Sequence, residues 1–544
     1  MQKVLTAEQM REVDRLTTER YGIPSILLME NAAHAVARVI TEKLGGSVND
    51  RRINILAGKG NNGGDGAALA RILWTQGANC FVYLFGSVSE LSGDARLNFD
   101  AIKTFDDSEG TNGPNESCLI LFADYDPNDF SVPAHHDVVV DALFGTGLSR
   151  PIDGPVGDLV ARLGRQRSRF PQLFVSIDIP SGLTSNYSDI IGPVFPADVT
   201  ITFTAMKVAN IMPPASVSNG EIVLANIGSP PDLIEEQPSK FFLAEKPDAR
   251  VWLKSTDFFD ESYKNKRGHA LIVAGSEDYS GAAVMCGNVA MRSGVGLTTM
   301  LVPASCKVEV ASRVIPEVIV RAIGEADGEV GSDAFAANED VIEKADSILV
   351  GPGLKATDKG VEKFVREIVE TRKVPVILDA GALWLFSPLK ADDVQPPANA
   401  GGSPLILTPH EGEFIRLLGT DDKEAIKDRV AAVRDFAVTN NVILVLKGER
   451  VLIASPDGRV VVNPTGNSGL GKAGNGDTLA GILAGFVAQA VKFKIDIFET
   501  VVAAVYVAGM AGDVAEKKYG KRVMTASDVR ECLVDVFAEF EKKE

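Results

Sequence analysis

Short apolar runs alternate with amphipathic segments along the first half of the chain. The amphipathic segments repeat apolar residues with the period of a helix, about 3.6 residues, whereas short runs rich in β-branched residues between turn residues are typical of buried strands. Strands and helices that alternate in this way form a parallel sheet covered by helices. We predict helices at 7–21, 25–44, 66–76 and 156–166, and strands at 53–57, 80–85, 119–122, 138–142, 173–177 and 199–203.

A second alternating series begins near residue 270, after a segment rich in proline and acidic residues at 228–239, which we predict to be a linker. The chain therefore divides into two α/β domains, 1–235 and 240–544. The apolar stretches 478–491 and 501–510 are rich in glycine and alanine and too short to cross a bilayer, so we expect buried helices there. The predicted strands of this second domain are 270–274, 347–350, 376–378, 405–407 and 442–446.

Composition and charge narrow the possible partners. A chain of 544 residues is too long for one hydrophobic core. Its net charge of −18 argues against nucleic acid and against anionic membranes as partners. The five cysteines are scattered, without a Cys-x-x-Cys pair, which favours a reducing cytoplasm over a disulfide framework. The first residues do not resemble a signal peptide.

A glycine-rich segment, Gly474-Asn475-Gly476-Asp477, comes directly before the first apolar helix. Glycines let backbone N–H groups turn inward at a helix N-terminus, where they can bind phosphate oxygens. Asp477 falls in the first helical turn, beside any hydroxyl held there. The segment therefore predicts phosphoryl transfer to a hydroxyl, with Asp477 as the base. The alternative is a glycine-rich turn capped by an aspartate.

Polar side chains also follow three predicted strands of the first half. Because the carboxyl ends of parallel strands meet at one edge of a sheet, we expect these groups to form one site. The first turn contains Gly-x-Gly-x-x-Gly, but the next strand ends without an acidic residue for a ribose, which argues against an ordinary dinucleotide fingerprint. The oxygens suit a weakly held cation as well as a ligand. Each group alone could be a strand-end cap. The residues are Asn61, Asn62 and Asp65, then Asp141, then Asp178 and Ser181.

Strand ends of the second half carry candidate groups as well. Asp379, His410 and Lys447-Gly448 each follow a predicted strand. A Lys-Gly pair there can bind an adenosine phosphate, whereas a lone histidine is more often structural. Small residues at 280–283 would allow a flat ring to approach closely, and helix packing explains them equally well.

In combination these motifs resemble two enzyme families. Gly60-Asn-Asn-Gly-Gly-Asp65, Asp141-Ala-Leu-Phe-Gly-Thr-Gly147 and Asp178-Ile-Pro-Ser-Gly182 resemble the NAD(P)H-hydrate epimerase domain. Gly351-Pro-Gly353, Pro409-His-Glu-Gly-Glu413, Lys447-Gly448 and Gly474-Asn-Gly-Asp477 resemble the ADP-dependent NAD(P)H-hydrate dehydratase domain. Both together, in this order, resemble the fused nicotinamide-nucleotide repair proteins of prokaryotes. The fold implied is an N-terminal Rossmann-like three-layer domain followed by a C-terminal ribokinase-like α/β domain.

The resemblance implies that the first domain interconverts the R and S hydrates of NADH and NADPH. The second domain would dehydrate the S form while converting ADP to AMP and phosphate. Asp477 and Asp178 are the candidate catalytic residues, and Asn62, Asp141 and Ser181 would hold a potassium ion. Mg²⁺ is expected in the second domain. The protein would be a cytoplasmic homo-oligomer whose partners are small molecules.

The binding residues that the resemblance implies fall into two sets. The hydrate would contact Asn61, Asn62, Gly63, Gly64, Asp65, Gly145, Thr146, Gly147, Leu148, Ser149, Arg150, Pro151, Asp178, Ala282, Gly353, His410 and Asp477. The adenine nucleotide would contact Lys447, Gly448, Glu449, Arg450, Val451, Gly474, Asn475 and Gly476.

The sequence departs from the family pattern at Lys355, at Leu470-Gly-Lys472 and at Val451, which leaves the preference for ADP or ATP open. Two other functions fit parts of the sequence. The second domain could be a small-molecule kinase with a regulatory first domain, or the first domain could bind nucleotides or a protein without catalysis. A kinase would release a stable phosphoester, whereas a repair enzyme would release inorganic phosphate.

Overall fold

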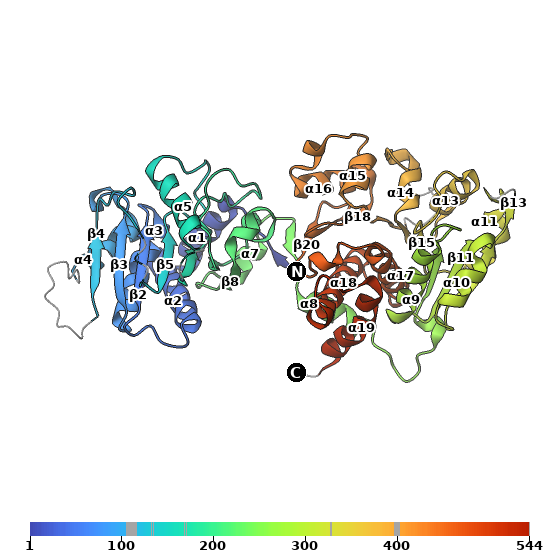
Figure 1. Cartoon of the computed structure of the whole chain (residues 1–544), viewed down its shortest axis with the longest axis horizontal. Helices are drawn as coiled ribbons and strands as arrows, with labels where there is room; N and C mark the ends of the chain where they lie inside the picture. The colour runs from blue at the N-terminus through green and yellow to red at the C-terminus, as the bar shows by residue number, and fades with distance from the viewer. Residues whose placement is uncertain are drawn as a thin grey trace. The chain divides into compact units, whose positions relative to one another are not determined.

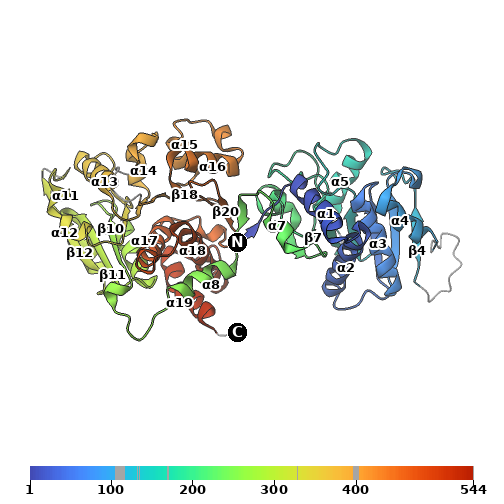
Figure 2. The same cartoon turned by 180° about the vertical axis from the view of Figure 1, so that it is seen from behind.

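The computed structural model describes residues 1–104, 117–131, 133, 135–167, 169, 171–326, 329–395 and 403–542. They form two compact units, an N-terminal unit of Lys3–Ser239 and a C-terminal unit of Lys240–Glu544 that also includes Met1–Gln2 (Figures 1 and 2). Both units are α/β, as predicted.

The N-terminal unit is built on a seven-stranded sheet in the order β4-β3-β2-β5-β6-β7-β8. Every neighbouring pair is parallel, so the carboxyl ends of all the strands point to the same edge. The strands are β2 (Arg52–Ala57), β3 (Asn79–Leu84), β4 (Leu119–Phe122), β5 (Val138–Ala142), β6 (Leu173–Ile177), β7 (Val199–Phe203) and β8 (Glu221–Ala225).

Helices cover both faces of this sheet and make three layers. Alternate residues of each strand point to opposite faces, so Ile53 and Ile55 pack with helices α2 and α3, whereas Leu56 packs with α5. Helix α1 packs separately, through Met10 and Val13, against Ala205 and Leu233. The helices are α1 (Ala7–Tyr21), α2 (Ser25–Lys43), α3 (Asn61–Thr75), α4 (Gly93–Lys103), α5 (Gly154–Arg167), α6 (Val208–Ile211) and α7 (Pro231–Glu235).

Two predictions for this unit need correction. Helix α3 begins at Asn61 rather than at residue 66, so the polar residues expected in a loop lie in its first turns. The predicted linker at 228–239 contains helix α7, which begins with Pro231 and buries Leu233. Proline is favoured at the first helical position because its φ is preset and its missing N–H is not needed there.

The C-terminal unit contains an eleven-stranded sheet in the order β1-β9-β20-β19-β18-β17-β16-β15-β10-β11-β12. Neighbouring strands from β18 to β12 are parallel, while β19 pairs antiparallel with both of its neighbours. The strands are β1 (Gln2–Lys3), β9 (Phe241–Leu243), β10 (His269–Val273), β11 (Leu297–Pro303), β12 (Ile319–Ile323), β15 (Ser347–Val350), β16 (Val376–Leu378), β17 (Leu405–Leu407), β18 (Ile443–Leu446), β19 (Val451–Ala454) and β20 (Val460–Asn463). A separate hairpin pairs β13 (Glu325–Ala326) with β14 (Glu329–Val330).

Helices lie on both faces of this sheet too. Figures 1 and 2 show α13 to α16 on one face and α9, α17 and α18 on the other. The latter face holds the larger core, in which Trp252 of α8 stacks on Phe486 of α17 with ring centroids 4.0 Å apart. The helices are α8 (Lys246–Ser255), α9 (Ser280–Arg292), α10 (Lys307–Arg313), α11 (Ala334–Ala337), α12 (Glu339–Ile342), α13 (Lys359–Thr371), α14 (Gly381–Leu385), α15 (Glu411–Leu417), α16 (Arg429–Asn440), α17 (Asn475–Phe493), α18 (Ile497–Tyr519) and α19 (Ala526–Glu541).

The two apolar helices near the C-terminus are longer than the sequence pattern indicated. Among the described residues, α18 alone is long and apolar enough to cross a membrane by length and composition. However, 67% of its most apolar window is buried inside the protein. The expectation that these segments are buried helices is therefore confirmed, while the expectation that both are too short to span a bilayer is wrong for α18.

Candidate active sites

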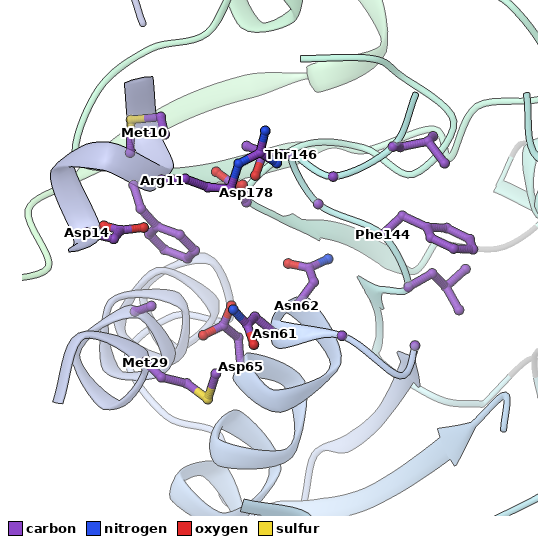
Figure 3. A pocket seen from close by; sticks show the side chains of 18 of the residues that line it. Met10, Arg11, Asp14, Met29, Asn61, Asn62, Asp65, Phe144, Thr146 and Asp178 are labelled. Atoms are coloured by element: carbon purple, nitrogen blue, oxygen red, sulfur yellow. The ribbon is translucent and has the colours of Figure 1, made fainter. Parts of the chain in front are cut away.

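A cavity of about 820 Å³ opens at the carboxyl edge of the N-terminal sheet. Its lining comes from α1, α2, α3, the turn after β5 and the residues that follow β6 and β7. Figure 3 shows Asp14, Asp65 and Asp178 entering this cavity from three different elements. The strand ends that the sequence predicted to converge therefore do so.

Glycines bring the start of α3 close to the neighbouring strand ends. A Cβ on Gly63 would lie 1.9 Å from the carbonyl oxygen of Gly58, and a Cβ on Gly58 would lie 2.0 Å from that of Leu143. No larger side chain fits at either position, because real Cβ contacts are far longer. This close approach places Asn62 and Asp65 at the cavity.

Asp141 at the end of β5 is fully buried, with 0% of its surface exposed. Its carboxylate accepts hydrogen bonds from Ser181 Oγ at 2.6 Å and from Ser181 N at 2.7 Å, and Leu143 N and Ser176 Oγ contribute two weaker ones at 3.2 Å. Burial raises the pKa of Asp141 to about 6, although these hydrogen bonds oppose the shift. Within the described part of the unit, no cationic side chain contacts this carboxylate.

Asp178 follows β6 in a left-handed conformation, with φ of 67°. Its Oδ1 forms an ion pair with Lys207 Nζ at 2.7 Å, and Lys207 also donates to Thr202 Oγ1 and to the carbonyl oxygen of Phe203. Only 1% of the Lys207 side chain is exposed. The ammonium thus has its three donors occupied and holds Asp178 at the cavity wall.

Two more carboxyls share this cavity. Burial raises the pKa of Asp65 well above its usual value, and the charges of Asp178 and Asp14 raise it further. Burial also raises the pKa of Asp14 to about 6, with Lys207 opposing and Asp178 reinforcing the shift. Asp14 Oδ1 is buried and, among the described residues, has no hydrogen-bond partner.

Most predicted residues of this half line the cavity, and some do not. Gly63, Gly64, Pro151, Asp141 and Ser181 lie outside the lining, where they shape or support it. The lining includes Asn61, Asn62, Asp65, Gly145, Thr146, Gly147, Leu148, Ser149, Arg150 and Asp178.

Sequence reasoning missed Lys207 and Asp14, which also line the cavity. Lys207 could have been predicted, because it follows β7, whose carboxyl end lies at the same edge of the sheet as the other strand ends. Asp14 carries a weaker signal. It stands four residues after Met10 on the face of α1 that packs inward, where a carboxylate is unusual.

In the C-terminal unit, helix α17 begins directly after Gly474, whose φ is 89°. A side chain there would be strained, and its Cβ would lie 2.5 Å from Met285 Sδ. Asp477 lies in the first turn. Burial raises the pKa of Asp477 to about 6, Asp379 raises it further and Lys447 opposes both effects. This is the placement that the glycine-rich segment predicted.

Lys447 lies between this helix start and two acidic residues. Its Nζ is 2.8 Å from Asp379 Oδ1 and 4.0 Å from Glu413 Oε2. A Cβ on Gly476 would lie 3.6 Å from the same Nζ. Burial lowers the pKa of Lys447, but Asp379 and Glu413 outweigh it and the net shift is upward. A lasting positive charge therefore lies beside the predicted anion site.

His410 has a structural task in this unit, as the lone-histidine interpretation anticipated. It is the N-cap of α15, where its Nδ1 accepts from Gly412 N at 3.0 Å and Glu413 Oε2 accepts from His410 N at 2.8 Å. The side chain is nevertheless 61% exposed, which leaves its Nε2 edge accessible.

The remaining predicted residues fall near the same strand ends. Ala282 lies on α9 next to Gly353, where an added Cβ would come 3.1 Å from the Ala282 Cβ. Residues 447–450 form the turn between β18 and β19, and Val451 begins β19. The small residues of α9 also serve helix packing, since a Cβ on Gly481 of α17 would lie 2.6 Å from the Cys286 carbonyl oxygen.

The departure from the family pattern at Leu470-Gly-Lys472 has a structural explanation. Lys472 Nζ donates to the carbonyl oxygens of Arg522 at 2.6 Å and Met524 at 2.9 Å, so it fastens the segment before α17. Leu470 packs against Gly512, where a Cβ would lie 2.7 Å from Leu470 Cδ1. Lys355 is exposed, and nothing in the structure explains it.

Comparison with known proteins finds two family matches. Residues 270–534 match a family described as NAD(P)H-hydrate dehydratase. Residues 25–209 match a family described as YjeF-related protein N-terminus.

Several relatives match along nearly the whole chain. The bifunctional NAD(P)H-hydrate repair enzyme of Moorella thermoacetica is 33% identical over 541 residues, covering 99% of this chain and 97% of the relative. That of Salinibacter ruber is 34% identical over 542 residues, covering 98% and 96%. A solved ADP/ATP-dependent NAD(P)H-hydrate dehydratase from Bacillus subtilis is 30% identical, covers 55% of this chain and 99% of its own, and has a TM-score of 0.46. The chain belongs to the family of bifunctional NAD(P)H-hydrate repair enzymes.

Proposed function

We propose that this protein repairs hydrated nicotinamide nucleotides. The N-terminal domain, 1–235, interconverts the R and S hydrates of NADH and NADPH. The C-terminal domain, 240–544, dehydrates the S hydrate and converts ADP to AMP and phosphate. The observation that carries the proposal is Asp477, a carboxylate at the N-terminus of α17 with the Lys447 ammonium nearby.

Dehydration needs help because hydroxide is a poor leaving group. Asp477 takes the proton of the hydrate hydroxyl, and that oxygen attacks the β-phosphorus of ADP as the bond to AMP breaks. The ring nitrogen lone pair then forms a C=N bond and expels phosphate. Loss of a proton from the adjacent ring carbon completes the double bond of NADH, so the atoms of water leave as part of phosphate and as protons.

The groups around Asp477 suit the charge that moves in this reaction. The backbone N–H groups of residues 474–476 lie at the N-terminal end of α17, where the helix dipole stabilises anions. Lys447 would pair with a phosphate, and the turn 447–451 would hold the adenosine part. Mg²⁺ bound with ADP would neutralise phosphate charge. Ala282, Gly353 and His410 would face the hydrate.

In the N-terminal domain, Asp178 is the proposed acid/base at the carbon that epimerises. The hydrate would occupy the 820 Å³ cavity between Asn61–Asp65 and the turn 145–151. Potassium would be held by Asn62, Asp141 and Ser181. The donor set fits such an ion, because Asp141 is a buried carboxylate that no described cationic side chain contacts. When bound, potassium would neutralise that carboxylate and fix the turn after β5.

We place the enzyme in the cytoplasm as a homo-oligomer that acts on small molecules. The net charge of −18 disfavours nucleic acid as a partner. A small-molecule kinase is the rival function for the C-terminal domain alone, and it leaves the cavity of the N-terminal unit without a role.

The products decide between the two. With purified S hydrate and ADP, we expect one NADH, one AMP and one inorganic phosphate per turnover, followed by absorbance and by phosphorus NMR. Asp477→Asn should lower this rate at least about 100-fold, the usual scale for loss of a general base. Asp435→Asn, on the exposed side of α16, is the matched control and should keep the wild-type rate. A stable phosphoester product, or an unchanged rate in Asp477→Asn, would contradict the proposal.

A further inference from the structure

More acidic side chains line the cavity of the N-terminal unit than have a role in the proposed function. Four carboxyls line it, those of Asp14, Asp65, Asp94 and Asp178, and Lys207 is its buried ammonium, whereas the other lining cations, Arg11, Lys59 and Arg150, are exposed. One ammonium neutralises one carboxylate. Burial disfavours the charged forms of Asp14 and Asp65, because an unpaired buried charge is costly.

The ammonium is committed to Asp178. Lys207 contacts Oδ1 of Asp178, and Thr202 Oγ1 lies 3.2 Å from the same oxygen. Oδ2 accepts no hydrogen bond from any described residue and faces Gly145, where a Cβ would lie 3.5 Å from it. Asp178 therefore offers one free carboxylate oxygen to the cavity in its charged form.

Asp14 presents a second free carboxyl from a different element. Packing of α1 against Ala205, two residues before Lys207, brings Asp14 to the cavity. Its Oδ1 is buried and has no partner among the described residues. A buried carboxyl oxygen without a partner costs free energy, so its presence in a ligand cavity points to a group that it contacts there.

Resting on the proposed epimerase function, we propose that Asp14 is a second proton-transfer residue of the epimerisation, working opposite the Lys207-paired Asp178. Lys207 is a positioning residue that pairs with Asp178, so that Asp178 serves as the base and Asp14 as the acid. Two carboxyls held in opposite protonation states can serve as acid and base in one reaction.

The step balances with water as the only co-reactant. Neutral Asp14 donates its proton to the hydrate hydroxyl, the C–O bond breaks, and the ring nitrogen lone pair forms a C=N bond as water leaves. A water molecule then adds to the other face of that carbon and gives one proton to Asp178. The proton gained by Asp178 is then lost to water and Asp14 regains one from water, which restores the starting enzyme. The reverse epimerisation uses the same two groups with their roles exchanged, and no electrons are gained or lost overall.

Asp65 is less suited to this task. Burial and two neighbouring carboxyls hold its pKa well above its usual value, whereas the pKa of Asp14 is raised only to about 6. An acid whose pKa lies near the working pH transfers protons more effectively in both directions. Asp65 instead lies in the run Asn61–Asp65 at the start of α3, which is proposed to hold the hydrate.

The test follows epimerisation directly, without ADP. R hydrate is prepared by exhausting the S form with the Asp178→Asn variant and ADP, then purified and mixed with wild-type protein or each variant while the two epimers are separated by chromatography. Asp14→Asn should lower kcat for epimerisation about 100-fold or more with KM little changed, because only proton transfer is lost. Glu19→Gln, on the exposed face of α1, is the control and should match wild type.

The outcomes separate this proposal from the function on which it rests. If wild-type protein does not accelerate epimerisation, the epimerase function fails. If wild-type protein does and Asp14→Asn remains within about threefold of it, the role of Asp14 is overturned. Asp14→Glu should recover part of the rate, since a carboxyl returns, whereas a merely structural aspartate would tolerate Asn at least as well as the longer Glu.

Two measurements on the wild-type protein need no variant. The groups facing Asp14 are Lys207, Asp178 and Asp65, so its titration belongs to this cluster. Because neutral Asp14 donates the proton, kcat/KM for epimerisation should fall as pH rises above about 6, the pKa of Asp14. A flat profile from pH 5 to 8 would overturn the proposal.

In ¹⁸O water each epimerisation should introduce one ¹⁸O at the hydroxyl, and full retention of ¹⁶O would overturn the C–O step.

Discussion

At the scale of single residues, Asp477 combines two properties that a base for hydroxyl activation needs. It lies at a helix N-terminus where phosphate can bind, and its pKa is raised to about 6 by burial and by Asp379. A base with a pKa near the working pH is largely ionised and still accepts a proton readily. The pKa of an exposed aspartate is about two units lower, so its carboxylate would be a weaker base.

This pKa sets the pH dependence of dehydration. Only ionised Asp477 can take the hydroxyl proton, so kcat/KM for the S hydrate should level off above about pH 6 and fall about tenfold per pH unit below it. The measurement is the initial rate with ADP between pH 4.5 and 8, corrected for acid decay of the hydrate. A rate independent of pH across this range would exclude Asp477 as the base.

The sequence revealed these residues to different degrees. Asp178 and Asp477 could be predicted because each follows a recognisable strand end or glycine turn. Lys207 follows β7 in the same manner, but Thr204-Ala205-Met206 separate it from the strand and hide the pattern. Asp379 was seen as a strand-end acid, yet its pairing with Lys447 depends on the order of β16, β17 and β18 in the sheet, which the local sequence does not contain.

At the scale of elements, helix α3 shows how packing overrides intrinsic preference. Two glycines near its start lower helix propensity by about 1 kcal/mol each relative to alanine, which explains why the sequence predicted a later beginning. The helix begins at Asn61 because those glycines let it approach Gly58 and Ala95 more closely than any side chain allows. The approach also delivers Asn62 and Asp65 to the cavity.

Substitution of these glycines should therefore have unequal effects. Gly63→Ala would place a methyl group 1.9 Å from the Gly58 carbonyl oxygen, so we expect it to destabilise the start of α3 by about 1–3 kcal/mol. Gly60→Ala meets no atom within 4 Å and has a φ of −93°, so it is the matched control and should change stability little. Hydrogen exchange of the α3 amides measures the stability of the start of this helix in each variant. Equal protection in the two variants would show that the close approach is not required.

Most strands that form continuous apolar runs were predicted, including the edge strand β4, but the buried inner strand β11 was missed. β5, β15 and β16 are continuous apolar runs and match their predicted bounds, apart from the functional Asp141 in β5. β8 and β12 are edge strands with exposed or half-exposed residues, so their sequences lack such a run. β19 and β20 were missed although they are mostly buried, because they form a short antiparallel meander within an otherwise parallel pattern.

At the scale of the whole molecule, the two units carry complementary chemistry. Each gathers carboxyls around one lysine, the buried Lys207 in the N-terminal unit and the partly buried Lys447 in the C-terminal unit, at the carboxyl ends of parallel strands. Hydration of NADH yields two epimers, and a dehydratase specific for one of them would leave the other unrepaired. A chain that holds both activities can recover the entire mixture.

The most direct test of this account supplies the wild-type protein with a mixture of both epimers and excess ADP and follows the return of NADH absorbance. We predict complete recovery at a rate well above that of spontaneous epimerisation, with one AMP and one phosphate formed per NADH. In Asp178→Asn, recovery should stop quickly at the S fraction and then continue only at the spontaneous rate. Rapid recovery of only the S fraction by the wild-type protein would contradict the central claim.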